Sequence, residues 1–309
     1  MTIGTQAQPL SGVPSRESLA DKLQAVLPKI VLAPSMAITL VFTYGFIVWS
    51  LVLSFTNSRM LPNYDFIGLS NYSKLFSMDR WTVAYTNLFI FGFLFIVIAI
   101  CVGTLLAILL DQKIRAEGVL RTIYLYPFAL SLIVTGTAWK WILNPEIGIE
   151  KLMHDIGFSR FQFDWLVDKD MAIYTIVIAA VWQASGFVMA IMLAGLRGVD
   201  NSIIKAAQID GATMPTIYRR IILPIMRPIF FSCFIILSHL AIKSFDLVVV
   251  LTAGGPGYSS DLPATFMYQY AFGRNQIGIG SASAMITLMG FIAILIPYLY
   301  SELRKKKHG

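Results

Sequence analysis

Residues 201–229 read NSIIKAAQIDGATMPTIYRRIILPIMRPI and form the one long polar interruption in the second half of an otherwise apolar chain. Gly211 and Ala212 divide this stretch into two short segments with helical periodicity. Glycine adopts backbone conformations that other residues avoid, so Gly211 permits a turn between the two segments. The second segment has an apolar side and a basic side. The stretch therefore predicts a basic helix–turn–helix element between two long apolar segments.

The composition is that of a membrane protein. Of the 309 residues, 57% are hydrophobic and 13% are charged, whereas a soluble domain is typically about 25% charged. The net charge of +7 is typical of Lys and Arg in cytoplasmic loops, and a nucleic acid partner is not expected. Cys101 and Cys233 both fall inside apolar segments, so they predict neither a disulfide nor a metal site.

Six apolar stretches are long enough to cross a bilayer, which takes about 20 residues of helix. The third contains Pro127, so we expect a kinked helix there. The stretches do not alternate as β-barrel strands do, so the sequence predicts an all-α integral membrane protein with six transmembrane helices. The stretches run from Val31 to Phe55, Val83 to Leu110, Gly118 to Leu143, Met171 to Gly195, Ile229 to Ala253 and Ser283 to Tyr300.

Lysine and arginine set the predicted orientation. The segments on the side of the two termini hold about twice as many Lys and Arg as the opposite loops of similar total length, and cytoplasmic loops carry such an excess. Both termini and residues 201–229 are therefore expected to be cytoplasmic.

The motifs of a self-contained enzyme are missing. The sequence has no G-x-x-x-x-G-K-[ST] phosphate loop, so the chain is not expected to bind and hydrolyse ATP itself by the common route. It also lacks H-E-x-x-H, C-x-x-C and G-x-S-x-G, and its three histidines are widely spaced. We expect neither a catalytic site nor a bound metal.

The fifth apolar stretch carries His239, Lys243 and Asp246, which would share one face of a continuous helix. A charge at mid-membrane costs about 2.5–3.5 kcal/mol even on the gentler scales, so these side chains are expected to face the interior of the bundle. They predict a Lys243–Asp246 pair that neutralises itself, a polar path for a solute, or both. Small residues border this face, namely Ser238, Ala241 and Ser244.

A second polar spot lies in the fourth stretch, where Trp182, Gln183 and Ser185 follow one another closely. An aromatic ring beside an amide suits a sugar, which has apolar ring faces and a polar rim. The same residue types are also ordinary anchors at the membrane surface, and both interpretations stay open.

Residues 201–229 also admit two interpretations from physics alone. Their basic side favours contact with anionic lipid head groups, and the alternative is a helix that docks into a groove of a cytoplasmic partner. We expect Asn201 or Ser202 to cap the first helix. Thr213 is expected to cap the second, with Pro215 in its first turn.

The chain resembles the permease subunits of bacterial ABC importers, in the binding-protein-dependent sugar transport family of the maltose and glycerol-phosphate type. The segment Lys205-Ala206-Ala207-x-x-Asp210-Gly211-Ala212, followed by Ile222-Leu223-Pro224, resembles the EAA loop of that family. The other matching blocks are Phe66 to Tyr72, Trp139-Lys140-Trp141, Gly195-Leu196-Arg197 and Leu251-Thr252-Ala253-Gly254-Gly255-Pro256. The resemblance therefore covers most of the chain.

This resemblance implies a type I ABC importer permease fold with a cytoplasmic coupling helix, and alternating access without chemistry on the sugar. It implies a second homologous permease subunit, two ATPase subunits that hold ATP and Mg²⁺, and a periplasmic sugar-binding protein. The location implied is the bacterial inner membrane, and the substrates implied are glucose, mannose, related monosaccharides or glucosides. The residues implied in coupling are Lys205, Ala206, Ala207, Asp210, Gly211 and Ala212.

The substrate path that we predict combines the polar residues of the fourth and fifth stretches with the sugar contacts that the resemblance implies before the Gly-Gly-Pro motif. Its members are Gln183, Ser238, Ala241, Lys243, Ser244 and Asp246. On the same resemblance the chain divides into a cytoplasmic tail (1–30), a first helix with a periplasmic loop (31–81), an ABC transmembrane permease core (82–303) and a basic cytoplasmic tail (304–309).

One departure from the family pattern concerns Lys205, which replaces the glutamate of the EAA motif. A lysine reverses the charge that would meet basic groups on the ATPase, although at the rim of a contact one charge is worth under about 1 kcal/mol. Two other classes of function remain: a secondary carrier in which Lys243 and Asp246 relay protons, and a membrane-anchored assembly protein.

Overall fold

The computed structural model describes residues 19–112 and 114–306. Within these residues the chain is helical, and extended pairing is limited to an isolated bridge between Thr56 and Phe66. The chain divides into two compact units, one ending at Trp49 and the other beginning at Ser50. Of the two predicted tails, residues 1–18 and 307–309 lie outside the described part.

The first unit is a long apolar helix. α1 (Leu19–Thr39), the π-helical turn η1 (Leu40–Tyr44) and α2 (Gly45–Ser54) follow one another, the last of them running into the second unit. The apolar part, Leu27–Ser54, is long enough to span a membrane, and its side chains are mostly exposed. This helix contributes little to a core of its own, as expected of a helix that faces lipid or another subunit.

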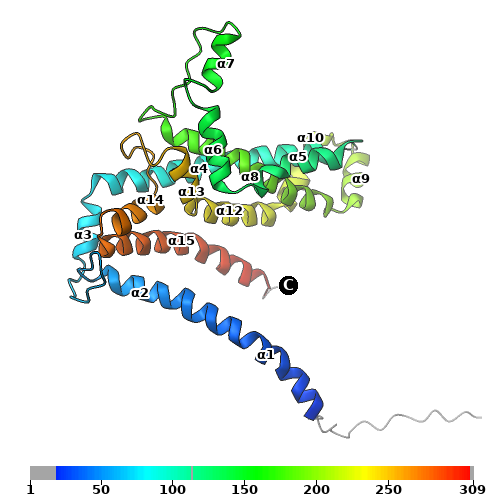
Figure 1. Ribbon diagram of the computed structural model, residues 1–309. Coiled ribbons are helices and arrows are strands. Elements are labelled where there is room, and N and C mark those ends of the chain that lie inside the picture. Colours follow the sequence, from blue (N-terminus) through cyan, green and yellow to red (C-terminus); the bar gives the residue numbers. More distant parts are fainter. Residues whose placement is uncertain (1–18, 113, 307–309) are drawn as a thin grey trace, which may run out of the picture. The chain divides into compact units, whose positions relative to one another are not determined.

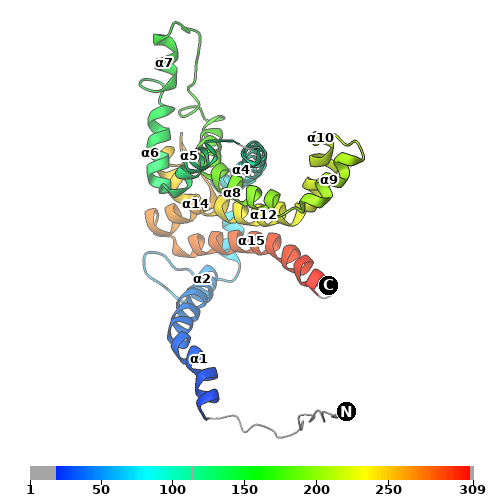
Figure 2. The same cartoon turned by 90° about the vertical axis from the view of Figure 1, so that its right-hand side faces the viewer.

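α4 (Asp79–Asp111) and α8 (Ala172–Arg197) form the centre of the second unit, and they pack along much of their lengths. Gly103 allows their close approach, because an added Cβ would overlap the side chain of Val188. α5 (Glu117–Ala129) and α12 (Arg227–Ile242) pack against this pair, as Figures 1 and 2 show.

A second cluster surrounds the start of α15 (Ile277–Lys306). α3 (Ser70–Phe76), α14 (Pro263–Tyr268) and the π-helical turn η3 (Gln269–Gly273) pack against it. The side chain of Asn71, in α3, donates to the carbonyl oxygens of residues 54 and 56, each at 2.9 Å. The loop that follows α2 is thereby fixed to α3.

α4 and α8 run in the same direction. Their first turns lie near the loop of residues 252–262, where Arg80 of α4 pairs with Asp261 and Tyr174 of α8 shares a cavity with that loop. Their last turns meet at the opposite end, where Arg197 lies 3.7 Å from Asp111. In a chain of six spans that cross the membrane in alternating directions, the second and fourth spans must be parallel, as α4 and α8 are.

Four of the six predicted spans are helices long and apolar enough to cross a membrane, by length and composition. The third is not a single helix, because α5 and α6 (Leu132–Ile142) meet at 100°. The break follows Pro127 by a few residues, where the sequence predicts a kink, but it is much sharper than a kink. Beyond it, the short α7 (Ile149–Asp155) lies at the tip of a projecting arm (Figures 1 and 2).

The fifth predicted span is also interrupted. α12 ends at Ile242, and α13 (Phe245–Leu251) begins after the break at Lys243 and Ser244. The prediction that His239, Lys243 and Asp246 share one face of a continuous helix is therefore wrong. The entry to α12 bends as well, because the segment Met214–Ile225 meets Arg227–Ile242 at 65°.

Candidate coupling loop and translocation path

The coupling loop, which we define as residues 200–214, begins with a capped helix. The Oδ1 atom of Asp200 accepts a hydrogen bond from the backbone N–H of Ser202 at 2.8 Å. Asp200 therefore caps α9 (Asn201–Ile209), in place of the expected Asn201 or Ser202. The same hydrogen bond lowers the pKa of the Asp200 carboxyl, because it favours the charged form.

The end of α9 is closed by its backbone. Gly211 has a φ of +81°, a conformation that glycine adopts without strain. The N–H of Gly211 donates to the carbonyl of Gln208, and the N–H of Ala212 donates to that of Ala207, each at 3.0 Å. These two bonds form a Schellman motif, so the turn predicted at Gly211 is confirmed.

The return segment begins at α10 (Met214–Ile217), with Pro215 in its first turn as predicted. Thr213 stands at the cap position, but its hydroxyl contacts that of Thr216 at 3.0 Å and does not cap the helix. The π-helical turn η2 (Tyr218–Ile222) and α11 (Leu223–Ile225) then lead to α12. This segment is fixed to the core by three buried side chains, Ile217, Ile222 and Met226.

The six residues predicted to couple lie together in this loop but differ in exposure. Ala207 is buried against the core and Ala212 is half-buried, whereas the others, Lys205, Ala206, Asp210 and Gly211, are exposed. Beside them Ile209 is 86% exposed. A large apolar side chain that is exposed on a capped helix is available as an anchor for a partner. The motif comparison missed Ile209 because it falls on a variable position of the EAA pattern.

An ionic cluster precedes the coupling loop. Arg197, at the end of α8, donates from Nη2 to Glu117 at 2.6 Å and lies 3.7 Å through Nε from Asp111. The three side chains are partly exposed, so each pair contributes at most about 1 kcal/mol. Their role is geometric, because they join the cytoplasmic ends predicted for α4, α5 and α8.

Three of the predicted path residues line one cavity. Gln183, Lys243 and Ser244 border a space of about 240 Å³ between α4, α5, α8 and the break after α12, which we call the inner cavity. Its other lining residues are apolar or aromatic, among them Phe95 and Phe128. Lys243 and Ser244 lie at the interruption between Ile242 and Phe245 and line the same space as Gln183.

Gln183 has a structural partner in this cavity. Its Nε2 donates to the carbonyl oxygen of Leu130 at 2.8 Å, at the break between α5 and α6, where the helical partner of that carbonyl is lost. Backbone groups at such breaks need a substitute partner inside a membrane. Ser244 donates to the carbonyl of Leu240 at 2.8 Å, so its oxygen remains as an acceptor. Lys243 takes part in no ion pair among the residues described.

The remaining path residues lie elsewhere. Ser238 and Ala241 line a separate apolar groove of about 430 Å³ between α4, α12 and α15. Asp246 is exposed in the first turn of α13 and borders neither space. Within residues 19–112 and 114–306 no ion pair joins it to Lys243, so the Lys243–Asp246 pair, one of the two alternatives left open by the sequence, is not formed in this conformation.

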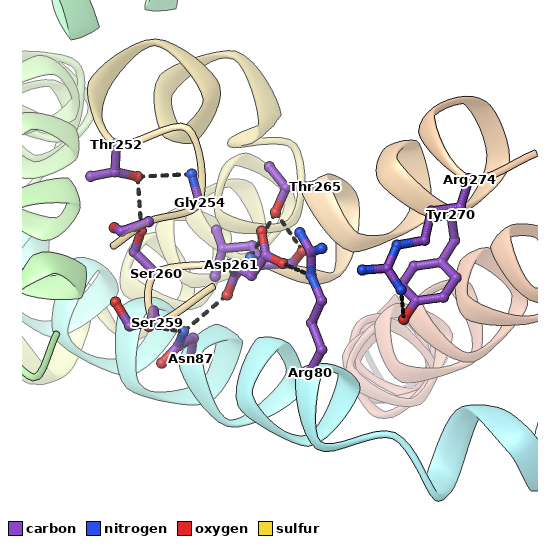
Figure 3. Close-up of polar contacts among 12 residues, drawn as sticks. Arg80, Asn87, Thr252, Gly254, Ser259, Ser260, Asp261, Thr265, Tyr270 and Arg274 are labelled. Carbon is purple, nitrogen blue, oxygen red and sulfur yellow. Dashed lines mark hydrogen bonds and ion pairs between the residues drawn. The ribbon is translucent and has the colours of Figure 1, made fainter. Parts of the chain in front are cut away.

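At the opposite end from the coupling loop, residues 252–262 form the Gly-Gly-Pro loop, which Figure 3 shows. Ser260 closes this loop, because its hydroxyl lies within hydrogen-bond distance of the Thr252 hydroxyl (2.8 Å) and of the carbonyl oxygen of Gly255 (2.7 Å). The N–H of Gly254 donates to the Thr252 hydroxyl at 3.2 Å. The loop is thus held by its own small polar residues.

Two residues of α4 clamp the Gly-Gly-Pro loop (Figure 3). Arg80 forms an ion pair with Asp261 at 2.5 Å, and the Asn87 amide donates to the carbonyls of Ser259 and Asp261 at 2.7 and 3.0 Å. Asp261 is 1% exposed. Burial raises the pKa of the Asp261 carboxyl, and the Arg80 guanidinium opposes that rise. Sequence reasoning missed this clamp, because its partners lie more than 170 residues apart.

Comparison with known proteins decides the family. The model of the family described as "Binding-protein-dependent transport system inner membrane component" matches residues 99–307. The chain belongs to this family. It is therefore the membrane permease component of an ABC importer, and the ATPase activity of such importers resides in other subunits.

Two curated relatives illustrate the range of this permease family. A probable ABC transporter permease protein of Pyrococcus horikoshii is 38% identical over 89% of this chain and 95% of its own length. The xylose/arabinose import permease protein XacH of Haloferax volcanii is 32% identical over 85% of this chain and 83% of its own length. The resemblance predicted from the EAA loop and the Gly-Gly-Pro motif is confirmed.

A solved structure supports the fold of the permease. A chain in the crystal structure of a bacterial ABC transporter involved in the import of the acidic polysaccharide alginate superposes with a TM-score of 0.79. The two chains are 19% identical, and the match covers 93% of this chain and 98% of the other. The all-helical ABC importer permease fold expected from the sequence is confirmed.

Proposed function

We propose that this permease carries a sugar across the membrane by alternating access. One observation carries the proposal: a rigidly capped coupling loop, with Ile209 exposed, lies at one end of the same helices that line the inner cavity. A relative that is 32% identical is named as a xylose/arabinose import permease. The inner cavity, with one lysine, one amide and aromatic side chains, suits a pentose or hexose, including the glucose or mannose that the sequence favours.

The partners belong to the same proposal. A second homologous permease would complete the path, two ATPase subunits would hold ATP and Mg²⁺, and a periplasmic sugar-binding protein would deliver the substrate. Ile209 would fill an apolar groove of one ATPase, with Lys205 and Asp210 at the rim of the contact. Lys205 is exposed, so its positive charge in place of the motif glutamate is compatible with a rim position, where a charge contributes little.

The orientation is also proposed. The distribution of Lys and Arg supports cytoplasmic termini and a cytoplasmic coupling loop. With α4 and α8 parallel, this orientation puts the Gly-Gly-Pro loop and the α7 arm on the opposite, extracytoplasmic side of the inner membrane.

The test of function is sugar uptake by membrane vesicles that contain the complete importer. Labelled D-xylose, L-arabinose, D-glucose and D-mannose are offered together with the cognate binding protein, with ATP inside or outside the vesicles. We expect uptake of at least one sugar that requires ATP on the side of the coupling loop and survives collapse of the proton gradient. Uptake that needs the proton gradient and no ATP would indicate the secondary carrier.

The coupling loop is tested by Gly211→Ala in the same vesicles. An alanine at a φ of +81° is disfavoured by roughly 1–2 kcal/mol, which disturbs the end of α9. We expect slower uptake and less ATPase in the purified complex. Gly157→Ala is the matched control, because Gly157 also has a positive φ and open space around its Cβ position but lies on the α7 arm. Equal losses in the two variants would contradict a coupling role.

A further inference from the structure

A second polar cavity lies at the end of the α4–α8 pair where the Gly-Gly-Pro loop stands. Its volume is about 430 Å³, within the roughly 300–1,000 Å³ typical of ligand sites. Its walls come from α4, from the turn that opens α8 and from the Gly-Gly-Pro loop. The polar and aromatic members of this outer pocket are Asn87, Lys169, Asp170, Tyr174, Tyr258 and Ser259.

The Gly-Gly-Pro wall of the outer pocket is held in place before any ligand arrives. Asn87 anchors the backbone of Ser259, and Arg80 anchors Asp261 next to it. The guanidinium of Arg80 also lies 6.0 Å from the centre of the Tyr258 ring. A preformed wall loses little conformational freedom on binding, which favours affinity.

The chemistry of the outer pocket suits an uncharged, polyhydroxylated ring. Tyr174 and Tyr258 offer apolar ring faces with polar tips. Lys169 and Asp170 take part in no ion pair within the described part of the chain, so a donor and an acceptor remain available. A carboxylated sugar would meet the like charge of Asp170 and a cationic sugar that of Lys169, so the pair as a whole favours a neutral ligand.

The outer pocket stands in line with the inner cavity on the same two helices. Along α4, Asn87 lines the outer pocket and Phe95 lines the inner cavity. Along α8, Tyr174 lines the outer pocket and Gln183 lines the inner cavity. At 1.5 Å of rise per residue, the two spaces are roughly 12–14 Å apart. In the proposed orientation, a solute released on the extracytoplasmic side meets the outer pocket first.

We propose that the outer pocket is a second binding site, which a neutral monosaccharide occupies before it reaches the inner cavity. This inference rests on the proposed sugar function. It adds a holding step: the sugar leaves its binding protein for Tyr174, Tyr258, Lys169 and Asp170 while the inner cavity is still closed to it.

The test measures protection of a cysteine placed in the outer pocket. In the importer assembled with its partner subunits, Cys101→Ser and Cys233→Ala remove the native thiols, and Val83→Cys adds one to the wall of the outer pocket. Its rate of reaction with a membrane-impermeant maleimide is measured with D-xylose, D-glucose, D-glucuronate or no sugar. Thr82→Cys is the matched control, because Thr82 is the adjacent, exposed residue of α4 and does not line the outer pocket.

We expect a neutral sugar that the importer transports to slow the reaction of Val83→Cys about threefold when it is present at about twice its dissociation constant. Glucuronate should give no protection, the Thr82→Cys control should react equally in all cases, and Tyr258→Leu should abolish the protection. Equal rates with and without sugar, or a Val83→Cys thiol that the partner subunits cover completely, would overturn the proposal. The proposed sugar import is tested independently of the outer pocket: it would be contradicted if the unmodified importer took up no sugar.

Discussion

Asp261 is the residue of the second unit whose charge is hardest to accommodate. Its carboxylate is 1% exposed, and within the described residues its Oδ1 has no hydrogen-bond partner. Arg80 supplies the compensating charge from the first turn of α4. A carboxylate in this position is tolerated only because its partner is present, since removal of one member of a buried pair leaves an isolated buried charge.

We therefore expect Arg80→Met to destabilise the permease by about 3–5 kcal/mol. Asp261→Asn should cost less, because Arg80 is partly exposed and can turn towards water. The double variant should be more stable than Arg80→Met alone. Thermal unfolding of the purified importer measures all three. Additive losses in the double variant would show that the two side chains are not coupled.

The stability of the Arg80→Met variant should depend on pH, because the pKa of the Asp261 carboxyl is shifted upward. Burial already raises the pKa of the Asp261 carboxyl above its ordinary value of 3.8, and loss of Arg80 raises it further. A raised carboxyl pKa destabilises the fold at high pH, and this loss is relieved as the pH falls through the folded-state pKa. The stability deficit of Arg80→Met should therefore shrink as the pH is lowered from neutrality. A deficit independent of pH would contradict this.

Ile209 is 86% exposed on α9, and in the proposed complex it is the apolar anchor for an ATPase subunit. A buried apolar anchor at the centre of an interface contributes about 2 kcal/mol or more, which is roughly 30-fold in affinity. Ile209→Asp should weaken association with the ATPase subunits by about that factor, as measured by titration of the purified permease with its ATPase. Ile147→Asp changes another exposed isoleucine, 66% exposed and far from the coupling loop, and it should leave the affinity unchanged. Equal affinity of the two variants would exclude an anchor role.

At the scale of elements, α5 and α8 approach each other at Gly186. A Cβ at this position would overlap the backbone carbonyl of Tyr124, and the neighbouring rings of Phe128 and Phe187 stack 4.5 Å apart. The helices cannot move apart without opening the inner cavity, which both of them line.

Gly186→Ala should therefore destabilise the permease by about 1–3 kcal/mol through overpacking, with a loss of uptake because the inner cavity changes shape. Gly92→Ala is the control, because no atom lies within 4 Å of its Cβ position, and alanine favours helix by up to about 1 kcal/mol. Thermal unfolding compares the two variants. A neutral Gly186→Ala would mean that α5 and α8 are farther apart in the assembled importer.

The helices that could be predicted from the sequence are the uninterrupted ones. α4 and α8 follow from runs of apolar residues, and they begin and end close to the predicted positions. The 100° bend at Leu130 and the interruption at Lys243 could not be predicted, because a break inside an apolar run leaves its hydropathy unchanged. Pro127 indicated a kink near the first break, whereas no proline lies near the second break at Lys243.

The candidate site divides in the same way. The coupling loop is local in sequence, so the turn at Gly211 followed from the residue type, whereas the capping residue was displaced by one position to Asp200. The inner cavity depends on contacts between distant segments, so Gln183 and Lys243 were found as polar residues but their neighbours were not. A continuous helix would have put Asp246 beside Lys243, and the break between them removes that pairing.

At the scale of the whole permease, the parallel packing of α4 and α8 puts two functional loops at opposite ends of one rigid pair. α4 has 33 residues, so its ends are about 50 Å apart, more than the roughly 30 Å of a bilayer core. The pair connects the coupling loop to the Gly-Gly-Pro loop, because α9 follows α8 in the chain and Arg80 of α4 pairs with Asp261.

This arrangement makes the membrane orientation testable with two single cysteines. In a permease without its native thiols, Lys151→Cys lies on α7 and Ile209→Cys lies on α9. Because the arm that carries α7 leads into the start of α8 and α9 follows its end, the two positions must lie on opposite sides of the membrane. The excess of Lys and Arg predicts that α9 is cytoplasmic. An impermeant maleimide should label Lys151→Cys in intact cells and Ile209→Cys only after permeabilisation. The reverse pattern would invert the topology, and labelling of both in intact cells would contradict the membrane crossing of α8.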